Sequence, residues 1–287
     1  MKPVRDFLEL IKFEHTIFAL PFAYLGMLLA ANGWPTFYQF FWITVAMASA
    51  RTLAMGFNRI VDRAIDARNP RTKDRPLVTG AISLRTAMVG TLIAAILLAT
   101  AAWMLGPLPF ILLPGAYFFL FFYSYTKRFT WLSHFILGFT DGLAALGAWA
   151  AIRGSLFTPQ DYPAWILLAV VTLWIGGFDM IYACQDVASD VHDGLHSIPA
   201  RFGIPFALSL SMICHGATIL LLASLGQLMN LGWPYWIGIA VTAGLLVWEH
   251  WLVRPDDLSR INQAFFNINS YISLTLFVSI WGALALV

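Results

Sequence analysis

The chain has 287 residues, of which 60% are hydrophobic and 11% are charged, and its formal net charge is +2. Soluble domains carry about 25% charged residues, so a water-soluble fold could not hide this much apolar surface. The composition excludes an ordinary soluble domain and makes lipid the expected solvent. The two cysteines, Cys184 and Cys214, lie in or beside apolar segments and indicate neither a disulfide framework nor a metal site.

Three long stretches contain no Asp, Glu, Lys or Arg, namely residues 86–126, 202–248 and 261–287. About 20 apolar residues cross a bilayer as a helix, so the first two stretches have room for two spans each. The alternation typical of strands is missing from the sequence, which favours an all-α integral membrane protein. In chain order we predict about nine transmembrane helices, at residues 13–32, 38–57, 86–105, 108–125, 132–152, 163–184, 206–228, 233–253 and 266–286.

Two of the charge-free stretches contain a segment that breaks helices. The Gly-Pro-Leu-Pro sequence of residues 106–109 divides the first, and the Asn-Leu-Gly-Trp-Pro sequence of residues 230–234 divides the second. The first predicted span follows a short basic segment, as it would in a signal peptide. It is long, contains Pro21 and lacks a clear cleavage site, so we expect it to remain as the first transmembrane helix.

The positions of the basic residues predict the orientation, because Lys and Arg near span ends stay on the cytoplasmic side. With the N-terminus inside, the cytoplasmic segments hold all 17 Lys and Arg residues except two: Arg153 lies outside, and Arg51 lies within a span. This asymmetry predicts a cytoplasmic N-terminus and an external C-terminus. It also places the two acidic segments described next on the cytoplasmic side.

Acidic residues at a spacing of four follow two of the predicted spans. The second span runs into one such ladder and the sixth span into the other; the ladders consist of Asn58, Asp62 and Asp66, and of Tyr182, Asp186 and Asp190. Residues four apart lie on nearly the same face of a helix, one turn from each other. Each ladder therefore presents its side chains in one direction.

Two carboxylate faces at the rim of an apolar bundle repel each other and lose hydration, so cations must offset their charge. Hard oxygen ligands suit Mg²⁺, which typically links a few carboxylates to the phosphates of a substrate. The pattern predicts a diphosphate held between the two helix ends through Mg²⁺. The predicted metal ligands, which are also the predicted catalytic residues, are Asp62, Asp66, Asp186 and Asp190.

Basic residues follow each ladder and complement the charge of a diphosphate. Arg71, Lys73 and Arg75 follow the first ladder, and Arg201 follows the second. Arg binds phosphate oxygens in a fork and Lys binds them as a point charge. We predict that these residues and Asn58 contribute to the substrate site, where Asn58 donates to a ligand or orients one.

Several ionisable residues lie inside spans, where such residues usually face the interior and have a function. Arg51 either pairs with an acceptor carboxylate or serves as a structural partner for Asp141 or Asp179, which are themselves candidates for the acceptor site. At the ends of spans, Glu249 and His250 are expected to be interfacial. Other hypotheses concern two pairs: Glu14 and His15 as substrate contacts, and His134 and His215 as interior groups with hydrogen-bond partners.

The two ladders resemble the motifs of the UbiA superfamily of intramembrane prenyltransferases, an Asn-Asp-x-x-x-Asp-type motif and a Tyr-x-x-x-Asp-x-x-x-Asp-type motif. The likeness continues in the Arg-Thr-x-x-Arg-Pro-Leu string at residues 71–77 and in the Ser-Ile-Pro-Ala-Arg-Phe-Gly string at residues 197–203. Arg59 departs from the pattern, since many members carry Asp after the motif asparagine. This departure puts one ligand in doubt.

The resemblance implies a bundle of about nine helices around a central chamber, forming one prenyltransferase domain over residues 1–287 with motifs at about 58–77 and 182–203. It implies Mg²⁺-dependent transfer of a polyprenyl group from a polyprenyl diphosphate to an aromatic acid. The chain looks equally like 4-hydroxybenzoate polyprenyltransferases of ubiquinone biosynthesis and like enzymes proposed to prenylate a naphthoate in a menaquinone route. The implied location is the bacterial inner membrane, with lipid and no nucleic acid as partner, and Tyr182 is implied as a substrate contact.

Two other classes of protein compete with this reading. A secondary transporter of a small anion or cation would place its acids near the bilayer midplane on broken helices, whereas these acids lie at one membrane face beside basic loops. A lipid phosphotransferase of the CDP-alcohol type would carry a contiguous Asp-Gly-x-x-Ala-Arg string. In this chain Asp193 and Gly194 are followed by Leu195 and His196 instead.

Overall fold

A computed structural model describes the chain at residues 2–11 and 13–286, and its side chains at residues 6–11 and 20–286. The hypothesis of substrate contacts for Glu14 and His15 concerns side chains outside this part. Over the described residues the chain forms helices and contains no strand, so the predicted all-α fold is confirmed.

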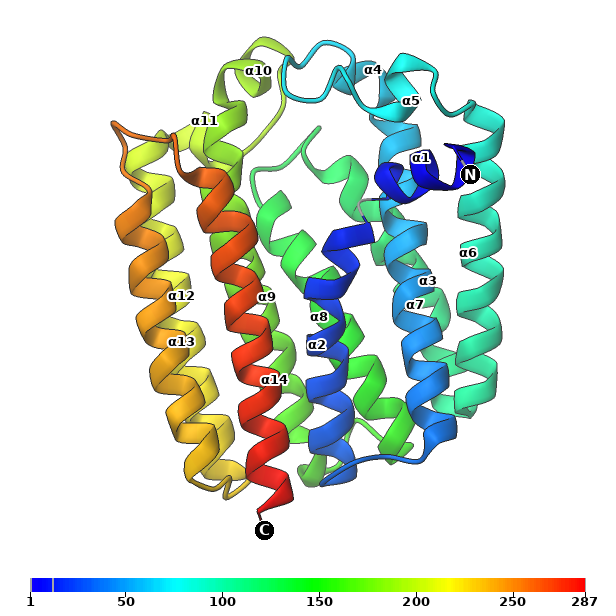
Figure 1. The fold of residues 1–287 in the computed structure, drawn as a ribbon, viewed down its shortest axis with the longest axis vertical. Coiled ribbons are helices and arrows are strands. Elements are labelled where there is room, and N and C mark those ends of the chain that lie inside the picture. Colours follow the sequence, from blue (N-terminus) through cyan, green and yellow to red (C-terminus); the bar gives the residue numbers. More distant parts are fainter. Residues whose placement is uncertain (1, 12, 287) are drawn as a thin grey trace.

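Long helices run side by side and form the body of the molecule (Figure 1). In chain order they are α2 (Phe13–Ala31), α3 (Phe37–Val61), α6 (Leu84–Leu105), α7 (Pro107–Thr126), α8 (Ser133–Arg153), α9 (Tyr162–Ala183), α12 (Ile204–Leu228), α13 (Trp233–Leu252) and α14 (Asn269–Ala285). The short elements are α1 (Lys2–Leu10), α4 (Arg63–Asp66), α5 (Pro76–Thr79), η1 (Pro159–Asp161), η2 (Cys184–Asp186), α10 (Val187–His192), α11 (Ile198–Phe202) and the π-turn η3 (Gln263–Ile268).

Seven helices within the described residues are long and apolar enough to cross a membrane, and α2 contributes a shorter apolar segment, Leu20–Ala31. The helix α13 packs between α12 and α14 and runs parallel to their axes (Figure 1). Each predicted span coincides with one long helix. The prediction of a multi-pass membrane bundle is confirmed, and the predicted number of spans is approximate, since seven of the long helices meet the criteria of length and hydropathy.

The two predicted helix breaks are present. Gly106 has a φ of 121°, which favours glycine, and Pro107 occupies the first turn of α7, where its missing N–H leaves no hydrogen bond unmade. The second break separates α12 from α13, where Asn230 has a φ of 51° and Pro234 lies in the first turn of the next helix. The conformations of Gly106 and Asn230 and the positions of the following prolines therefore determine where these helices end and begin.

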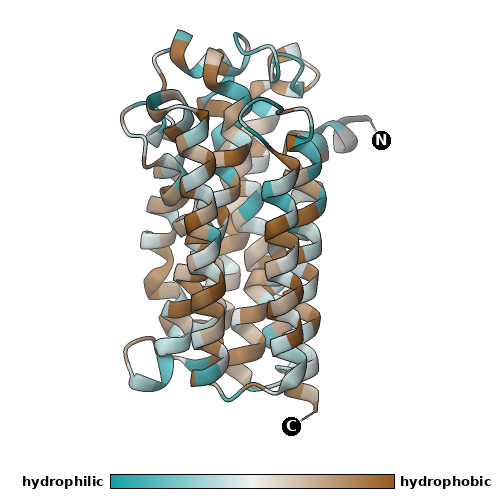
Figure 2. Ribbon diagram, turned by 90° about the vertical axis from the view of Figure 1, so that its left-hand side faces the viewer, coloured by the Kyte–Doolittle hydropathy of each residue, from teal (hydrophilic) through white to brown (hydrophobic). Residues whose placement is uncertain are grey.

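Both acidic ladders lie at one end of the bundle. The short helices α4 and α5 follow the first ladder, η2 and α10 carry most of the second, and all lie at the end that also holds the N-terminus (Figure 1). The C-terminus lies at the opposite end. Hydrophobic residues cover much of the helix shafts, and hydrophilic residues gather at the two ends (Figure 2). Two segments about 120 residues apart in the chain thus share one end of the bundle.

A close approach of α8 to α9 brings the acids of these helices next to a common cavity. A Cβ atom added at Gly138 would collide with the carbonyl oxygen of Thr172 on α9. One turn along, a Cβ at Gly142 would lie 2.8 Å from the side chain of Leu168. Small residues allow two helix backbones to approach closely in a membrane, where packing contributes most of the attraction between them.

We expect Gly138→Ala to lower the melting temperature of the protein in detergent. The added methyl group forces the two backbones apart, and overpacking of this kind typically costs about 1–3 kcal/mol. The matched control is Gly147→Ala on the same helix, where an added Cβ meets no atom within 4 Å. Equal melting temperatures for the two variants would contradict the close approach.

Candidate active site

Two adjoining cavities open at the motif end of the bundle. The larger has a volume of about 860 Å³ and is lined mainly by α3, α7, α8, α9 and the π-turn before α14. The smaller, of about 180 Å³, lies between the two motif segments. The residues that line both cavities are Asn58, Arg59, Asp62, Arg71, Arg75, Ser124 and Lys127. A molecule with an ionic head and an apolar body could therefore occupy both.

The small cavity brings together all four acids of the two ladders, Asp62, Asp66, Asp186 and Asp190. Asp62 caps α3 and Asp66 lies on the short helix α4. On the other side the chain tightens into the 3₁₀ turn η2 at Asp186 before α10 presents Asp190. The ladders are therefore interrupted helix ends rather than continuous helices, and they face each other.

Each of these acids is paired with a different cation. The pairs and their N–O distances are Arg128 with Asp62 at 2.8 Å, Arg75 with Asp66 at 2.6 Å, Arg71 with Asp186 at 2.6 Å, and Lys127 with Asp190 at 3.1 Å. Asp66, Asp186 and Asp190 are buried. The pairing offsets the cost of placing several carboxylates in one poorly solvated place.

The charges of this site also shift the pKa of its groups outside the membrane spans. Burial raises the pKa of the Asp62 carboxyl, and the hydrogen bond from Arg128 opposes that effect. Burial alone would lower the pKa of the Arg71 guanidinium, but hydrogen bonds to Asp186 and its negative charge outweigh burial and raise it. Arg71 therefore stays charged while it holds Asp186.

The residues of the small cavity suit a hard divalent cation in their chemistry. Their candidate ligands are carboxylate oxygens, supplemented by the amide of Asn58, and this is the donor set that Mg²⁺ prefers. Among the described residues no three His, Cys, Asp or Glu side chains are grouped closely enough to hold a metal ion by themselves. The carboxylates face Arg and Lys instead, and these cations can bind phosphate oxygens.

The first ladder is also ordered by its own side chains. The Asn58 amide donates to Oδ2 of Asp62 at 2.8 Å and accepts a hydrogen bond from Arg59 at 3.0 Å. Across the cavity, the Tyr182 hydroxyl accepts a hydrogen bond from Arg71 at 3.0 Å, and the Arg71 guanidinium lies 5.0 Å from the centre of the tyrosine ring. Asn58 and Tyr182 thus orient charged residues of the two motifs.

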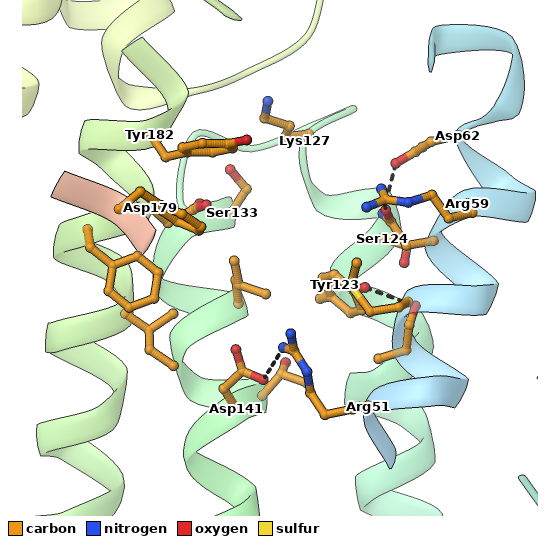
Figure 3. Close-up of a pocket in the computed structure, with 18 of the residues that line it drawn as sticks. Arg51, Arg59, Asp62, Tyr123, Ser124, Lys127, Ser133, Asp141, Asp179 and Tyr182 are labelled. Carbon is orange, nitrogen blue, oxygen red and sulfur yellow. Dashed lines mark hydrogen bonds and ion pairs between the residues drawn. The ribbon is translucent and has the colours of Figure 1, made fainter. Parts of the chain in front are cut away.

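The large cavity is also lined by Asp141 on α8 and Asp179 on α9. Arg51 pairs with Asp141 at 3.5 Å, so the structural contact considered for Arg51 is present, and its contact with an acceptor stays a prediction. The Arg51 Nε atom is nevertheless buried and has no hydrogen-bond partner. Figure 3 shows this pair deeper in the pocket than Asp62, while Asp179 and Tyr182 on α9 face α3 across it.

Asp179 has a partner of another kind. The Nε2 atom of His134 accepts a hydrogen bond from the backbone N–H of Ile198, so its Nδ1 carries the proton and donates it to Asp179 at 2.6 Å. The imidazole in this arrangement is neutral, and no Arg or Lys among the described residues pairs with Asp179. His134 is fully buried with both nitrogens bonded, as expected.

Some predicted site residues lie elsewhere. Lys73 and Arg201 are exposed and line neither cavity. The prediction that Glu249 is interfacial is wrong, because its side chain is fully buried and accepts a hydrogen bond from Asn269 at 3.0 Å. Its neighbour His250 bonds to His215 at 2.9 Å.

Four residues of the site were not predicted as ligands: Arg59, Asn69, Lys127 and Arg128. All four line the small cavity, and Asn69 donates to Asp186 at 3.0 Å. Lys127 and Arg128 directly follow the charge-free stretch 86–126 on the predicted cytoplasmic side. They are the first charged residues after a predicted span, and this position could have identified them as site residues.

A profile of the UbiA prenyltransferase family matches residues 19–271. The chain is similar to the 4-hydroxybenzoate octaprenyltransferase of Methylobacillus flagellatus, with 31% identity over 255 residues that cover 89% of this chain and 84% of that protein.

Among solved structures the chain is similar to the apo structure of a UbiA homolog from Aeropyrum pernix K1. The two are 32% identical with a TM-score of 0.85, over 93% of this chain and 97% of that one. It also shares its fold with a UbiA homolog from Archaeoglobus fulgidus bound to DMAPP and Mg²⁺, at 18% identity and a TM-score of 0.75, over 98% of this chain and 100% of that one.

Proposed function

Because the chain belongs to the UbiA prenyltransferase family, we propose that it transfers a polyprenyl group from its diphosphate to an aromatic acid in quinone biosynthesis. The curated relative named above supports 4-hydroxybenzoate as the acceptor, and a dihydroxynaphthoate is the alternative. One observation carries the proposal: acids and cations from two distant motifs line a single small cavity that adjoins a larger one.

The small cavity is the proposed site of the diphosphate. Asp62, Asp66, Asp186 and Asp190 would hold Mg²⁺ there, and Mg²⁺ when bound supplies positive charge that stabilises the departing diphosphate. When the acids hold Mg²⁺, the cations that pair with them in this structure become free to bind phosphate oxygens. These cations are Arg71, Arg75, Lys127 and Arg128. Asn58 keeps the Asp62 carboxylate in place through its amide.

The large cavity is the proposed site of the prenyl chain and the acceptor. Its walls include Phe22, Trp174 and Phe178, which exclude water from the carbon that reacts. Aromatic faces also attract a cation, which favours charge developing on the allylic carbon as the C1–O bond lengthens. The Arg51 guanidinium, with its unbonded Nε, is the proposed partner of the acceptor carboxylate.

Asp179 is the proposed acceptor of the proton that the aromatic ring loses. When the ring attacks C1, the C1–O bond breaks, the new C–C bond forms, and the ring C–H proton must leave for aromaticity to return. Asp141 is less suited to this role because Arg51 offsets its charge. Asp179 lines the cavity, is 24% exposed, and is held in position by the neutral His134.

The orientation completes the proposal. The motif end would face the cytoplasm of a bacterial cell, where soluble aromatic acids are made, and the C-terminus would lie outside the inner membrane. The lipid phase would admit the prenyl chain to the bundle. This topology follows from the excess of Lys and Arg on the motif side.

A product assay in membranes tests this function. Membranes containing the protein, given Mg²⁺, prenyl diphosphates of several lengths, 4-hydroxybenzoate and a dihydroxynaphthoate, are expected to form one prenylated acid that mass spectrometry detects. Membranes from cells without the protein are the control. Uptake of an aromatic acid into proteoliposomes without any prenylated product would contradict the proposal and indicate transport.

A further inference from the structure

Arg59 is a buried cation that forms no direct ion pair among the described residues, although Asp66 and Asp62 attract it at longer range. Its side chain is 8% exposed, and it donates to the neutral Asn58 amide at 3.0 Å. Among the described residues no carboxylate oxygen lies within 4.0 Å of its guanidinium. A buried charge is costly unless another charge or several hydrogen bonds compensate it. The guanidinium of Arg59 could therefore take up an anion in direct contact, which none of the described carboxylates provides.

A count of the charged side chains around the small cavity also identifies Arg59 as unpaired. Its lining includes five Arg or Lys side chains and five Asp side chains. Four of these acids pair with four of these cations as described above. The fifth acid, Asp193, pairs with Arg68 at 3.0 Å, and Arg68 is not part of the lining. Arg59 is the cation left over.

Arg59 lies where the two cavities meet. It lines both of them, and Figure 3 shows its guanidinium directed from α3 into the pocket, close to Ser124 and Asp62. Arg51 lies eight residues earlier on the same helix, about 12 Å deeper along its axis. The two arginines are thus at different depths, and one small anion cannot bridge them.

We propose that Arg59 binds the diphosphate of the donor directly, so that this chain holds the donor without requiring a divalent cation for all of its affinity. This inference rests on the proposed function. A guanidinium forms two parallel hydrogen bonds with phosphate oxygens, and its charge does not depend on a metal. An acid at this position would act only through a bound cation, whereas Arg59 contributes positive charge itself.

Binding of geranyl diphosphate to the purified protein in nanodiscs, measured by calorimetry, tests the inference. The wild type is expected to bind it in EDTA, and more tightly in Mg²⁺. Arg59→Gln is expected to weaken binding in EDTA by at least about 10-fold, because a hydrogen bond between charged groups is lost. Arg59→Lys, which keeps the charge, is expected to lie between the two.

Arg63→Gln is the matched control, since Arg63 is exposed on the following turn, forms no ion pair among the described residues and lines neither cavity. It should bind like the wild type. In the transfer assay, Arg59→Gln should raise the KM for the donor and leave the KM for the acceptor unchanged. Thermal unfolding of each variant establishes that it is folded, and Arg59→Lys provides the comparison if the Gln variant is not.

Three results would overturn the inference. They are binding in EDTA that Arg59→Gln does not weaken, binding by the wild type in Mg²⁺ but not in EDTA, and an increase confined to the KM for the acceptor. Failure of the wild type to bind geranyl diphosphate under either condition would instead count against the proposed function, and the inference would fall with it.

Discussion

Replacing Asp62 or Asp186 with alanine, in separate variants, should abolish prenyl transfer in membranes while the protein is still produced. Each carboxylate lines the small cavity and is proposed to hold Mg²⁺ against the diphosphate. Removing one protein group that stabilises the charge of a transition state typically lowers the rate by about 10²–10³-fold. We therefore expect the rate of prenyl transfer to fall by at least about 100-fold. The measurement is the initial rate of product formation at equal protein levels.

Asp256→Ala is the control for this experiment. Asp256 is an exposed acid in the segment between α13 and the π-turn, and it lines neither cavity. The same assay with EDTA should silence the wild type, and added Mg²⁺ should restore it. Full activity of either variant, or activity that survives chelation unchanged, would refute the metal role of these acids.

Asp179→Asn should reduce kcat by about 10²–10⁴-fold, the usual contribution of a general base, with little change in the KM for either substrate. The amide retains the size of the side chain but cannot accept the ring proton. His134→Gln should reduce kcat less, because His134 only positions Asp179 through the hydrogen bond at 2.6 Å. Steady-state kinetics of the purified protein measure both effects.

Asp141→Asn distinguishes the two acids of the large cavity. Because Asp141 pairs with Arg51, its loss should alter the KM for the acceptor more than kcat. A wild-type kcat in Asp179→Asn would exclude Asp179 as the proton acceptor. A loss of kcat in Asp141→Asn but not in Asp179→Asn would assign that role to Asp141.

The fold was predictable wherever a structural feature is determined by residues that are neighbours in the sequence. Apolar length indicated the spans, and the Gly106–Pro107 break could be read directly because both residues act on their own backbone. The ladders were equally accessible, since a spacing of four places side chains on one face. The structure shows the four acids around a single cavity, which is the convergence that the sequence predicted.

The partners of those acids were not predictable, because they come from distant parts of the chain. Lys127 lies 63 residues from Asp190, and Arg128 lies 66 residues from Asp62. A local pattern contains no information about such pairs. Glu249 was misplaced for the same reason, since its position at a span end suggested water, while Asn269 on another helix allows it to be buried.

The basic loop after the first ladder shows how turn geometry limits prediction. Arg71, Lys73 and Arg75 were equivalent candidates by composition. In the structure, backbone and side-chain bonds fold the loop tightly, including one from Thr72 to the Asp66 carbonyl at 2.9 Å. This fold directs Arg71 and Arg75 to the acids and leaves Lys73 in solvent. A difference of two positions within this loop decides whether a basic side chain reaches the acids, and hydrophobic periodicity does not predict that difference.

The one-to-one pairing of the motif acids has a consequence for the order in which ligands arrive. The four motif carboxylates are paired with Arg71, Arg75, Lys127 and Arg128. A divalent ion that binds alone would have to displace a cation from each acid without providing that cation with a new counter-ion. A diphosphate provides the counter-ion. For the proposed reaction, this pairing predicts uptake of the metal already chelated by the donor, and a weak affinity of the protein for the free ion.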